Sequence, residues 1–142
     1  MAIYTKYDTA IEKLCDKKID AFGTTDTWKA VIHTDAPITT TDSTLTDLVQ
    51  IAGSNGYTTG GTSITFNSTR TGGTITSTGT DVVWTASGGN LGASTTGRYI
   101  SVYDDTSAAD DLWCSWDYGS AFTVADGETL TLDFGANIWT MT

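Results

Sequence analysis

The sequence predicts a mainly β protein: a single antiparallel β-sandwich or jelly-roll domain with an N-terminal amphipathic helix. Residues 97–134 contain three segments whose side chains alternate in character with the period of two that a pleated strand requires. The connections between these segments are rich in Asp and Gly, which favour tight turns between antiparallel neighbours. Thr is the commonest residue of the chain, Gly occurs 15 times and Pro once, a composition that favours strands and turns over helices.

The N-terminal segment has a different pattern. Between residues 4 and 22, apolar side chains recur at helical spacing with Lys, Asp and Glu between them, which predicts an amphipathic helix that stops at Gly23. The helix either packs on its own sheet or forms an arm that docks on another subunit. With 142 residues, the chain is expected to divide into this helix or arm at 1–23 and one β-sandwich domain at 24–142.

The remaining elements follow in chain order. An apolar segment at 45–51 predicts a short helix or an irregular cover over one end of the sheet. Strands are predicted at residues 27–34, 63–67, 74–77, 81–85, 99–103, 112–118, 130–134 and 137–142. About eight evenly spaced strands with turn residues between them favour a sandwich or a jelly roll, and the pattern does not separate the two connectivities.

The charge of the chain limits its partners. The net charge is −10 and the sequence pI about 4.1, which disfavours contact with nucleic acid or with an anionic membrane. Residues 1–20 contain four Lys and four acidic residues, so the acidic surplus lies beyond them. The chain has no signal-peptide pattern and no apolar run long enough to span a bilayer, so we expect synthesis in a cytoplasm. Cys15 and Cys114 are expected to be two buried free thiols rather than a disulfide.

No recognised catalytic grouping occurs in the sequence, so we expect no enzymatic activity, cofactor or bound metal. Two acidic pairs, at 104–105 and 110–111, flank a four-residue loop and offer ligands for Ca²⁺, but their spacing does not match an EF-hand loop. A glycosidase would need two of these carboxylates across a sugar, which acids clustered on one turn do not favour. His33 is the only histidine, and on a strand without a neighbouring nucleophile or metal ligand it is expected to be structural or at the surface.

Aromatic residues near the C-terminus admit two interpretations. They form part of a core, or they stack on a sugar, as aromatic faces do in lectins. Trp113 and Trp116 are an odd number of positions apart on one predicted strand, so at least one of them is expected to leave the core and contact another chain or a ligand.

Several segments, in order, resemble a family of small structural proteins of tailed bacteriophages. They are WKAVI at 28–32, IAGSNGYTTGG at 51–61, DVVWTA at 81–86, RY at 98–99 with YDDT at 103–106, WDYG at 116–119 and ADGE at 125–128. The resemblance implies a non-enzymatic virion component that decorates or cements the outside of a capsid by binding the major capsid protein, or else a tail or fibre part. It further implies assembly with other copies, and a trimer is the first expectation because three-fold positions are abundant on icosahedral shells.

This interpretation requires a protein interface, and the sequence offers candidates for it. They are Tyr4, Tyr7, Ile11, Leu14, Trp113 and Trp139. The rival interpretation, from a different class, is a carbohydrate-binding module for host attachment that uses Trp113, Trp116 or Trp139.

Overall fold

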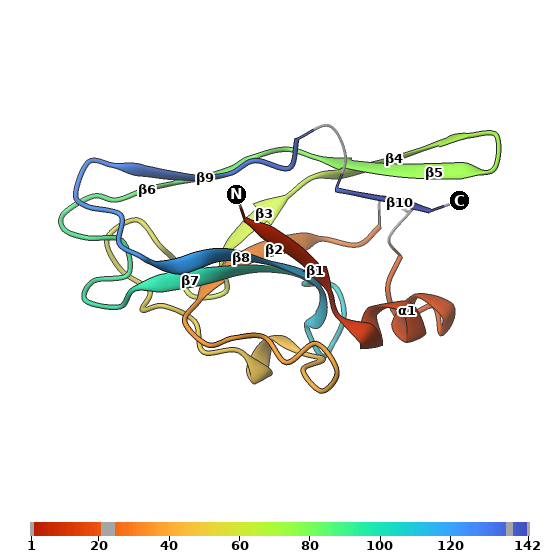
Figure 1. Ribbon diagram of the computed structural model, residues 1–142, viewed down its shortest axis with the longest axis horizontal. Helices are drawn as coiled ribbons and strands as arrows, with labels where there is room; N and C mark the ends of the chain where they lie inside the picture. Colours follow the sequence, from red (N-terminus) through yellow and green to blue (C-terminus); the bar gives the residue numbers. More distant parts are fainter. Residues whose placement is uncertain (1, 21–24, 136–137, 142) are drawn as a thin grey trace.

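The chain forms a β-sandwich whose two layers are built from antiparallel strands (Figure 1). The computed structural model describes residues 2–20, 25–135 and 138–141. One layer is a five-stranded sheet of order β1-β8-β7-β2-β3, here called the main sheet. The other, here called the second layer, contains a three-stranded sheet of order β10-β5-β4 and the β6-β9 pair. The predicted fold class is therefore confirmed.

The strands of each layer have the following bounds. The main sheet consists of β1 (Ile3–Lys6), β8 (Asp111–Phe122), β7 (Gly97–Asp104), β2 (Trp28–His33) and β3 (Thr62–Ile64). The second layer consists of β10 (Trp139–Met141), β5 (Thr74–Gly79), β4 (Phe66–Thr71), β6 (Val82–Thr85) and β9 (Thr129–Leu132). A helix, α1 (Asp8–Cys15), and a 3-10 helix, η1 (Leu45–Asp47), complete the described elements.

Aromatic side chains fill the space between the layers. Trp28 of the main sheet packs on Phe66 of the second layer, with ring centroids 5.0 Å apart, and Trp116 packs on Phe134 at 5.5 Å. Only Thr65 separates β3 from β4, so the chain passes here directly from one layer to the other. Burial of these large rings contributes to the apolar stabilisation of the domain, together with buried Ile, Val and Leu side chains.

The centre of the main sheet, made of β2, β7 and the first half of β8, is buried on both faces. Residues 34–61, here called the loop layer, cover the face that is turned away from the second layer (Figure 1). The Tyr103 hydroxyl donates a 2.8 Å hydrogen bond to the carbonyl of Gly60, and the amide of Ile51 donates to Ile32. At Gly61 an added Cβ would lie 1.9 Å from the Ala30 carbonyl oxygen, so only glycine permits this close approach. Double coverage explains why seven of the eight residues of β7 are buried although their pattern alternates.

A β-bulge turns both tryptophans of β8 into the core. In the β7–β8 register Val102 pairs with Cys114 and Tyr103 with Leu112, which leaves Trp113 as the extra residue on β8. The alternation of side chains therefore shifts by one position at Trp113. Trp113 is 2% exposed and Trp116 9% exposed, so the expectation that one of them leaves the core is wrong.

The N-terminal segment begins as a strand. The predicted helix at 4–22 is corrected: Ile3–Lys6 forms β1, and α1 covers only Asp8–Cys15. β1 pairs with β8, Tyr4 opposite Trp116, and this long-range pairing outweighs the local helical pattern. The helix ends early because Lys17 adopts a left-handed φ of 57° while the amide of Lys18 donates to the Lys13 carbonyl, a Schellman-type end.

Other predicted elements are confirmed with shifted ends. The strand predicted at 63–67 is corrected: Thr62–Ile64 forms β3 of the main sheet, and Phe66–Thr71 forms β4, which pairs with β5 in the predicted hairpin. The segment at 45–51 starts with η1, whose Thr44 and Asp47 form a capping box. The predicted helix stop at Gly23, the domain boundary at 23/24 and residues 136, 137 and 142 lie outside the described residues. Within the described ranges, no helix has the length and apolar character to cross a membrane.

The two cysteines are free, as predicted, but they lie in different surroundings. Cys114 is buried in the main sheet, whereas Cys15 at the end of α1 is exposed, so the expectation that both are buried is wrong for Cys15. Burial raises the pKa of the Cys114 thiol well above its ordinary value, which keeps it protonated and unreactive.

Candidate binding surface

A hollow of about 410 Å³ opens beside β1, between the two layers. It is lined by Tyr4, Lys6, Ile11, Trp113, Trp139 and Thr140, which come from β1, α1, β8 and β10. β1 is the outermost strand of the main sheet, and β10 is the outermost strand of its own sheet. The hollow therefore lies at an open side of the sandwich, where both layers end.

Four of the six predicted interface residues meet in this hollow. Tyr4 and Ile11 form its N-terminal wall and are 39% and 38% exposed, while Trp139 is partly buried on the β10 side. Trp113 lies at the floor, where its ring packs on Trp28 and Trp139 with centroid distances of 6.0 Å and 5.8 Å. Its expected role as an exposed contact is wrong, because it is almost entirely buried.

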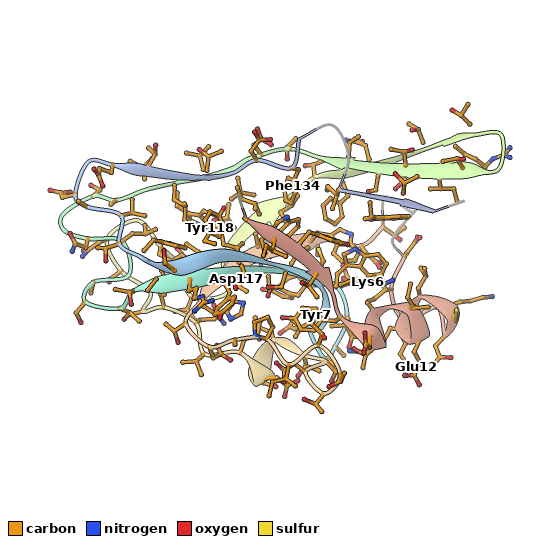
Figure 2. All side chains as sticks on the ribbon, viewed as in Figure 1. Lys6, Tyr7, Glu12, Asp117, Tyr118 and Phe134 are labelled. Atoms are coloured by element: carbon orange, nitrogen blue, oxygen red, sulfur yellow. The ribbon has the colours of Figure 1, made fainter. Side chains whose placement is uncertain are left out.

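The other two predicted interface residues lie elsewhere. Tyr7 is fully buried on the loop-layer side of the main sheet, so its expected role in an interface is wrong (Figure 2). Its hydroxyl is joined to the Ser101 hydroxyl at 2.9 Å. Leu14 is half-buried and lines a separate hollow with Lys17, Ile19 and Asp20.

The chemistry of the hollow is that of a binding surface. Lys6 is the one charged residue among those that line it, and Thr140 adds a hydroxyl. Burial raises the pKa of the Tyr4 hydroxyl, so this group stays neutral at physiological pH. No pair of titratable groups faces across the lining described, and its partly exposed apolar side chains offer a place for an apolar side chain or ring to bind.

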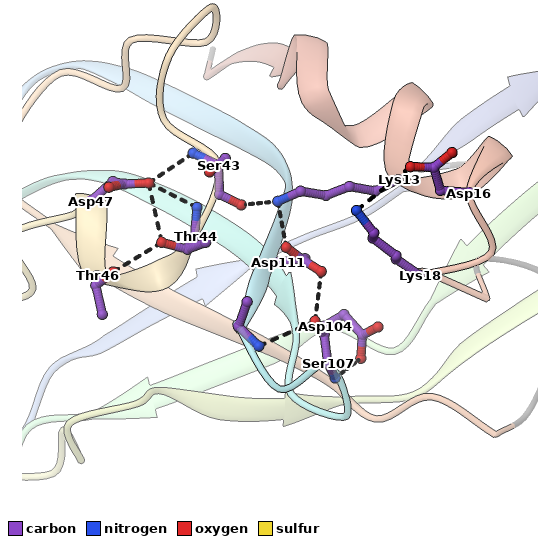
Figure 3. A network of polar contacts seen from close by, with 11 residues as sticks. Lys13, Asp16, Lys18, Ser43, Thr44, Thr46, Asp47, Asp104, Ser107 and Asp111 are labelled. Atoms are coloured by element: carbon purple, nitrogen blue, oxygen red, sulfur yellow. Dashed lines mark hydrogen bonds and ion pairs between the residues drawn. The ribbon is translucent and has the colours of Figure 1, made fainter.

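Three carboxylates of the acidic loop at 104–111 are engaged in contacts within the protein. Asp111 pairs with Lys13 of α1 and accepts a 2.6 Å hydrogen bond from Ser107, as Figure 3 shows. Asp105 pairs with Lys29 at 2.9 Å, and Asp104 accepts hydrogen bonds from the backbone amides that follow it. Within the part of the chain that the structure describes, no three His, Cys, Asp or Glu side chains are grouped to hold a metal ion. The loop carboxylates instead attach α1 and close the turn.

A chain of polar groups is buried under the loop layer. His33 Nδ1 lies 3.2 Å from the Asp35 carboxylate, and His33 Nε2 lies 2.8 Å from the Ser101 hydroxyl. These contacts resemble those of a hydrolase triad, and sequence reasoning missed them because Ser101 is 68 positions from His33. Both His33 and Ser101 are completely buried, and neither lines a described hollow, so no substrate reaches the hydroxyl. The array holds β2, β7 and the loop layer together.

Burial makes His33 a source of acid sensitivity. It lowers the pKa of His33 below the ordinary value of 6.5, against the opposing influence of Asp35. The unfolded chain therefore binds a proton more readily than the folded one, and this contribution to stability is lost as the pH falls below about 6.5. In His33→Gln the lost hydrogen bonds are expected to lower the free energy of unfolding by about 1–2 kcal/mol at pH 8.

The wild-type advantage over His33→Gln is expected to shrink between pH 7 and pH 5. Thermal unfolding of both proteins across this range, at constant ionic strength, measures the difference. A difference in the free energy of unfolding that stays constant or increases toward pH 5 would contradict the lowered pKa of His33.

The comparisons with known proteins place no further constraint on this surface. No protein-family model matches the chain, and no curated protein or solved structure matches it.

Proposed function

We propose that this chain is a non-enzymatic structural protein of a bacteriophage virion, which decorates or cements the outside of the capsid by binding the major capsid protein. The observation that carries the proposal is the hollow beside β1, where exposed apolar side chains of Tyr4 and Ile11 lie next to Trp139 at an open side of the sandwich. Partly exposed aromatic and aliphatic side chains around a hollow are typical of protein interfaces.

Charge and architecture support the same proposal. The segment that contains β1 and α1 has equal numbers of acidic and basic residues, whereas the rest of the chain carries the surplus of −10. A shell-bound protein with this distribution presents its neutral end to the lattice, while the acidic body keeps free copies soluble. The resemblance to small phage structural proteins is what directs the proposal to a capsid in particular.

The carbohydrate-binding alternative receives less support. Two of the three tryptophans expected to stack on a sugar, Trp113 and Trp116, are buried in the core. Trp139 remains with Tyr4 and Thr140 at the hollow, so loss of glycan binding in Trp139→Ala with the fold intact would favour this alternative.

Rebinding to shells tests the proposed function. Capsids of the phage that encodes the protein, stripped of it, are mixed with the wild type, with Ile11→Asp and with Val83→Asp. Val83 is a matched control because it is an exposed apolar residue, 54% accessible, on β6 and outside the hollow. The same change therefore introduces the same charge at both positions.

The wild type and Val83→Asp are expected to saturate the shells at one symmetry-related stoichiometry. Ile11→Asp is expected to bind at least about tenfold more weakly, because a carboxylate at an apolar contact has to be desolvated. Failure of the wild type to bind would overturn the proposed function. If Ile11→Asp binds the shells as tightly as the wild type, the hollow is not part of the surface that contacts the capsid.

A further inference from the structure

β1 is an open edge with few of the features that protect edge strands. All four of its residues, Ile3–Lys6, are exposed, and Ile3 is 66% accessible. The strand contains no proline, and its register with β8 shows no bulge. Lys6 at its end is its only charged residue. Its length of four residues and the charge of Lys6 are the two protective features that it has, and without a proline or a bulge the edge can still pair with another strand.

The backbone groups of β1 alternate between β8 and the outside. Directly after the strand, the amide of Tyr7 donates a 3.1 Å hydrogen bond to the Trp113 carbonyl of β8. Because N–H and C=O groups alternate in direction along an antiparallel strand, those of Ile3 and Thr5 also point to β8. Those of Tyr4 and Lys6 then point away from the sheet, where a further strand would pair.

We propose that a second copy of this chain occupies this edge, with the two β1 strands antiparallel about a two-fold axis at Tyr4. In this register Tyr4 pairs with Tyr4 of the second copy, and Lys6 pairs with Ala2. These positions have outward N–H and C=O groups, so each pair exchanges two hydrogen bonds. The two tyrosine rings lie on the same face beside the two hollows, and no like charges oppose each other.

Symmetry favours a second copy over an open array. If β1 paired with a different edge strand of the second copy, such as β3 or β4, the contact would join two different surfaces. Each added copy would then present a free β1 for the next copy, and the assembly would grow into a ring or a filament. When β1 of one copy pairs with β1 of the other, the edge is covered in both copies and the assembly is complete as a dimer. The two-fold assembly differs from the trimer expected from capsid symmetry, and it does not depend on the protein being a virion component.

Proline at Tyr4 tests the pairing because this amide points away from β8. Tyr4→Pro removes the two central hydrogen bonds between copies and leaves the pairing with β8 intact, since proline is tolerated on the open side of an edge strand. Tyr4→Ala is the matched control, which removes the ring and keeps the amide. Lys6→Pro and Lys6→Ala form a second pair at the other outward position, in case Tyr4→Pro does not fold.

Light scattering with size-exclusion chromatography and sedimentation equilibrium measures the assembly of the protein alone. The wild type is expected to be a dimer of about twice the 15.0 kDa chain mass. The proline variants are expected to raise the dimer dissociation constant about tenfold or more over their alanine controls. Because each copy carries −10 charges, added salt is expected to strengthen the dimer.

Amide hydrogen exchange gives a second readout. The Tyr4 and Lys6 amides are expected to be protected at dimer concentrations and to exchange freely on dilution. A wild type that stays monomeric, a trimer, or a dimer that survives both proline variants would overturn the inference. None of these results bears on binding to the capsid through Ile11, so the two proposals fail separately.

Discussion

Replacing Trp113 with Ala is expected to lower the free energy of unfolding by about 3–5 kcal/mol. The side chain is almost completely buried and packs on Trp28 and Trp139, so its removal leaves a large cavity at the junction of the two layers. As the bulge residue of β8, Trp113 is held by a backbone that cannot easily move to fill this space.

Urea unfolding followed by tryptophan fluorescence measures the loss. Trp113→Phe is the control, because it keeps most of the apolar volume and removes an indole N–H that has no hydrogen-bond partner among the described residues. It is expected to cost less than half as much as Ala. A Trp113→Ala protein within about 1 kcal/mol of the wild type would show that the bulge does not anchor the core.

Replacing Lys13 with Ala is expected to cost about 3 kcal/mol, because Asp111 then stays buried without its cation. The two side chains are 12% and 6% exposed, and the Lys13 ammonium also donates to the Ser43 carbonyl, so this pair joins α1, β8 and the loop layer (Figure 3). The ion pair between Lys18 and Asp16 is the matched control, since its side chains are 61% and 52% exposed. Lys18→Ala is expected to change stability by less than about 0.5 kcal/mol.

A double-mutant cycle separates the pairing from the loss of either side chain. Lys13→Ala, Asp111→Ala and the double variant are compared by thermal and urea unfolding. The double variant is expected to lose clearly less than the sum of the two single losses, because no buried charge is left unpaired. Additive losses would mean that the two groups do not interact in solution.

The strands were predictable where alternation is local. The patterns at 27–34 and 81–85 found β2 and β6 to within a residue or two, and in β6 side chains of one parity point into the core. At 112–118 the pattern found β8 but placed Trp113 on the wrong face, because the bulge at Trp113 depends on the opposing strand β7, which no local periodicity records. The same limit applies to β1, whose partner on β8 is remote in the sequence.

The candidate surface was predictable in part. Tyr4 and Ile11 belong to the N-terminal amphipathic segment and Trp139 to the C-terminal aromatic residues, and the structure brings all three to one hollow. The prediction that Tyr7 lies at an interface is wrong because the loop layer covers the outer face of the main sheet. A loop without periodicity does not show in its sequence which residues it covers. The buried array of Asp35, His33 and Ser101 cannot be recognised in the sequence, because Ser101 lies 68 positions from His33.

The order of strands in the main sheet also bears on how the protein is made. β1 is synthesised long before its partner strand, since Asp117 lies 114 positions after Ile3, so β1 cannot pair with β8 until that strand has left the ribosome. By contrast, β7 and β8 are neighbours in the sequence and can form their hairpin on their own. Until β8 has been made, both edges of β1 are therefore open to other nascent chains.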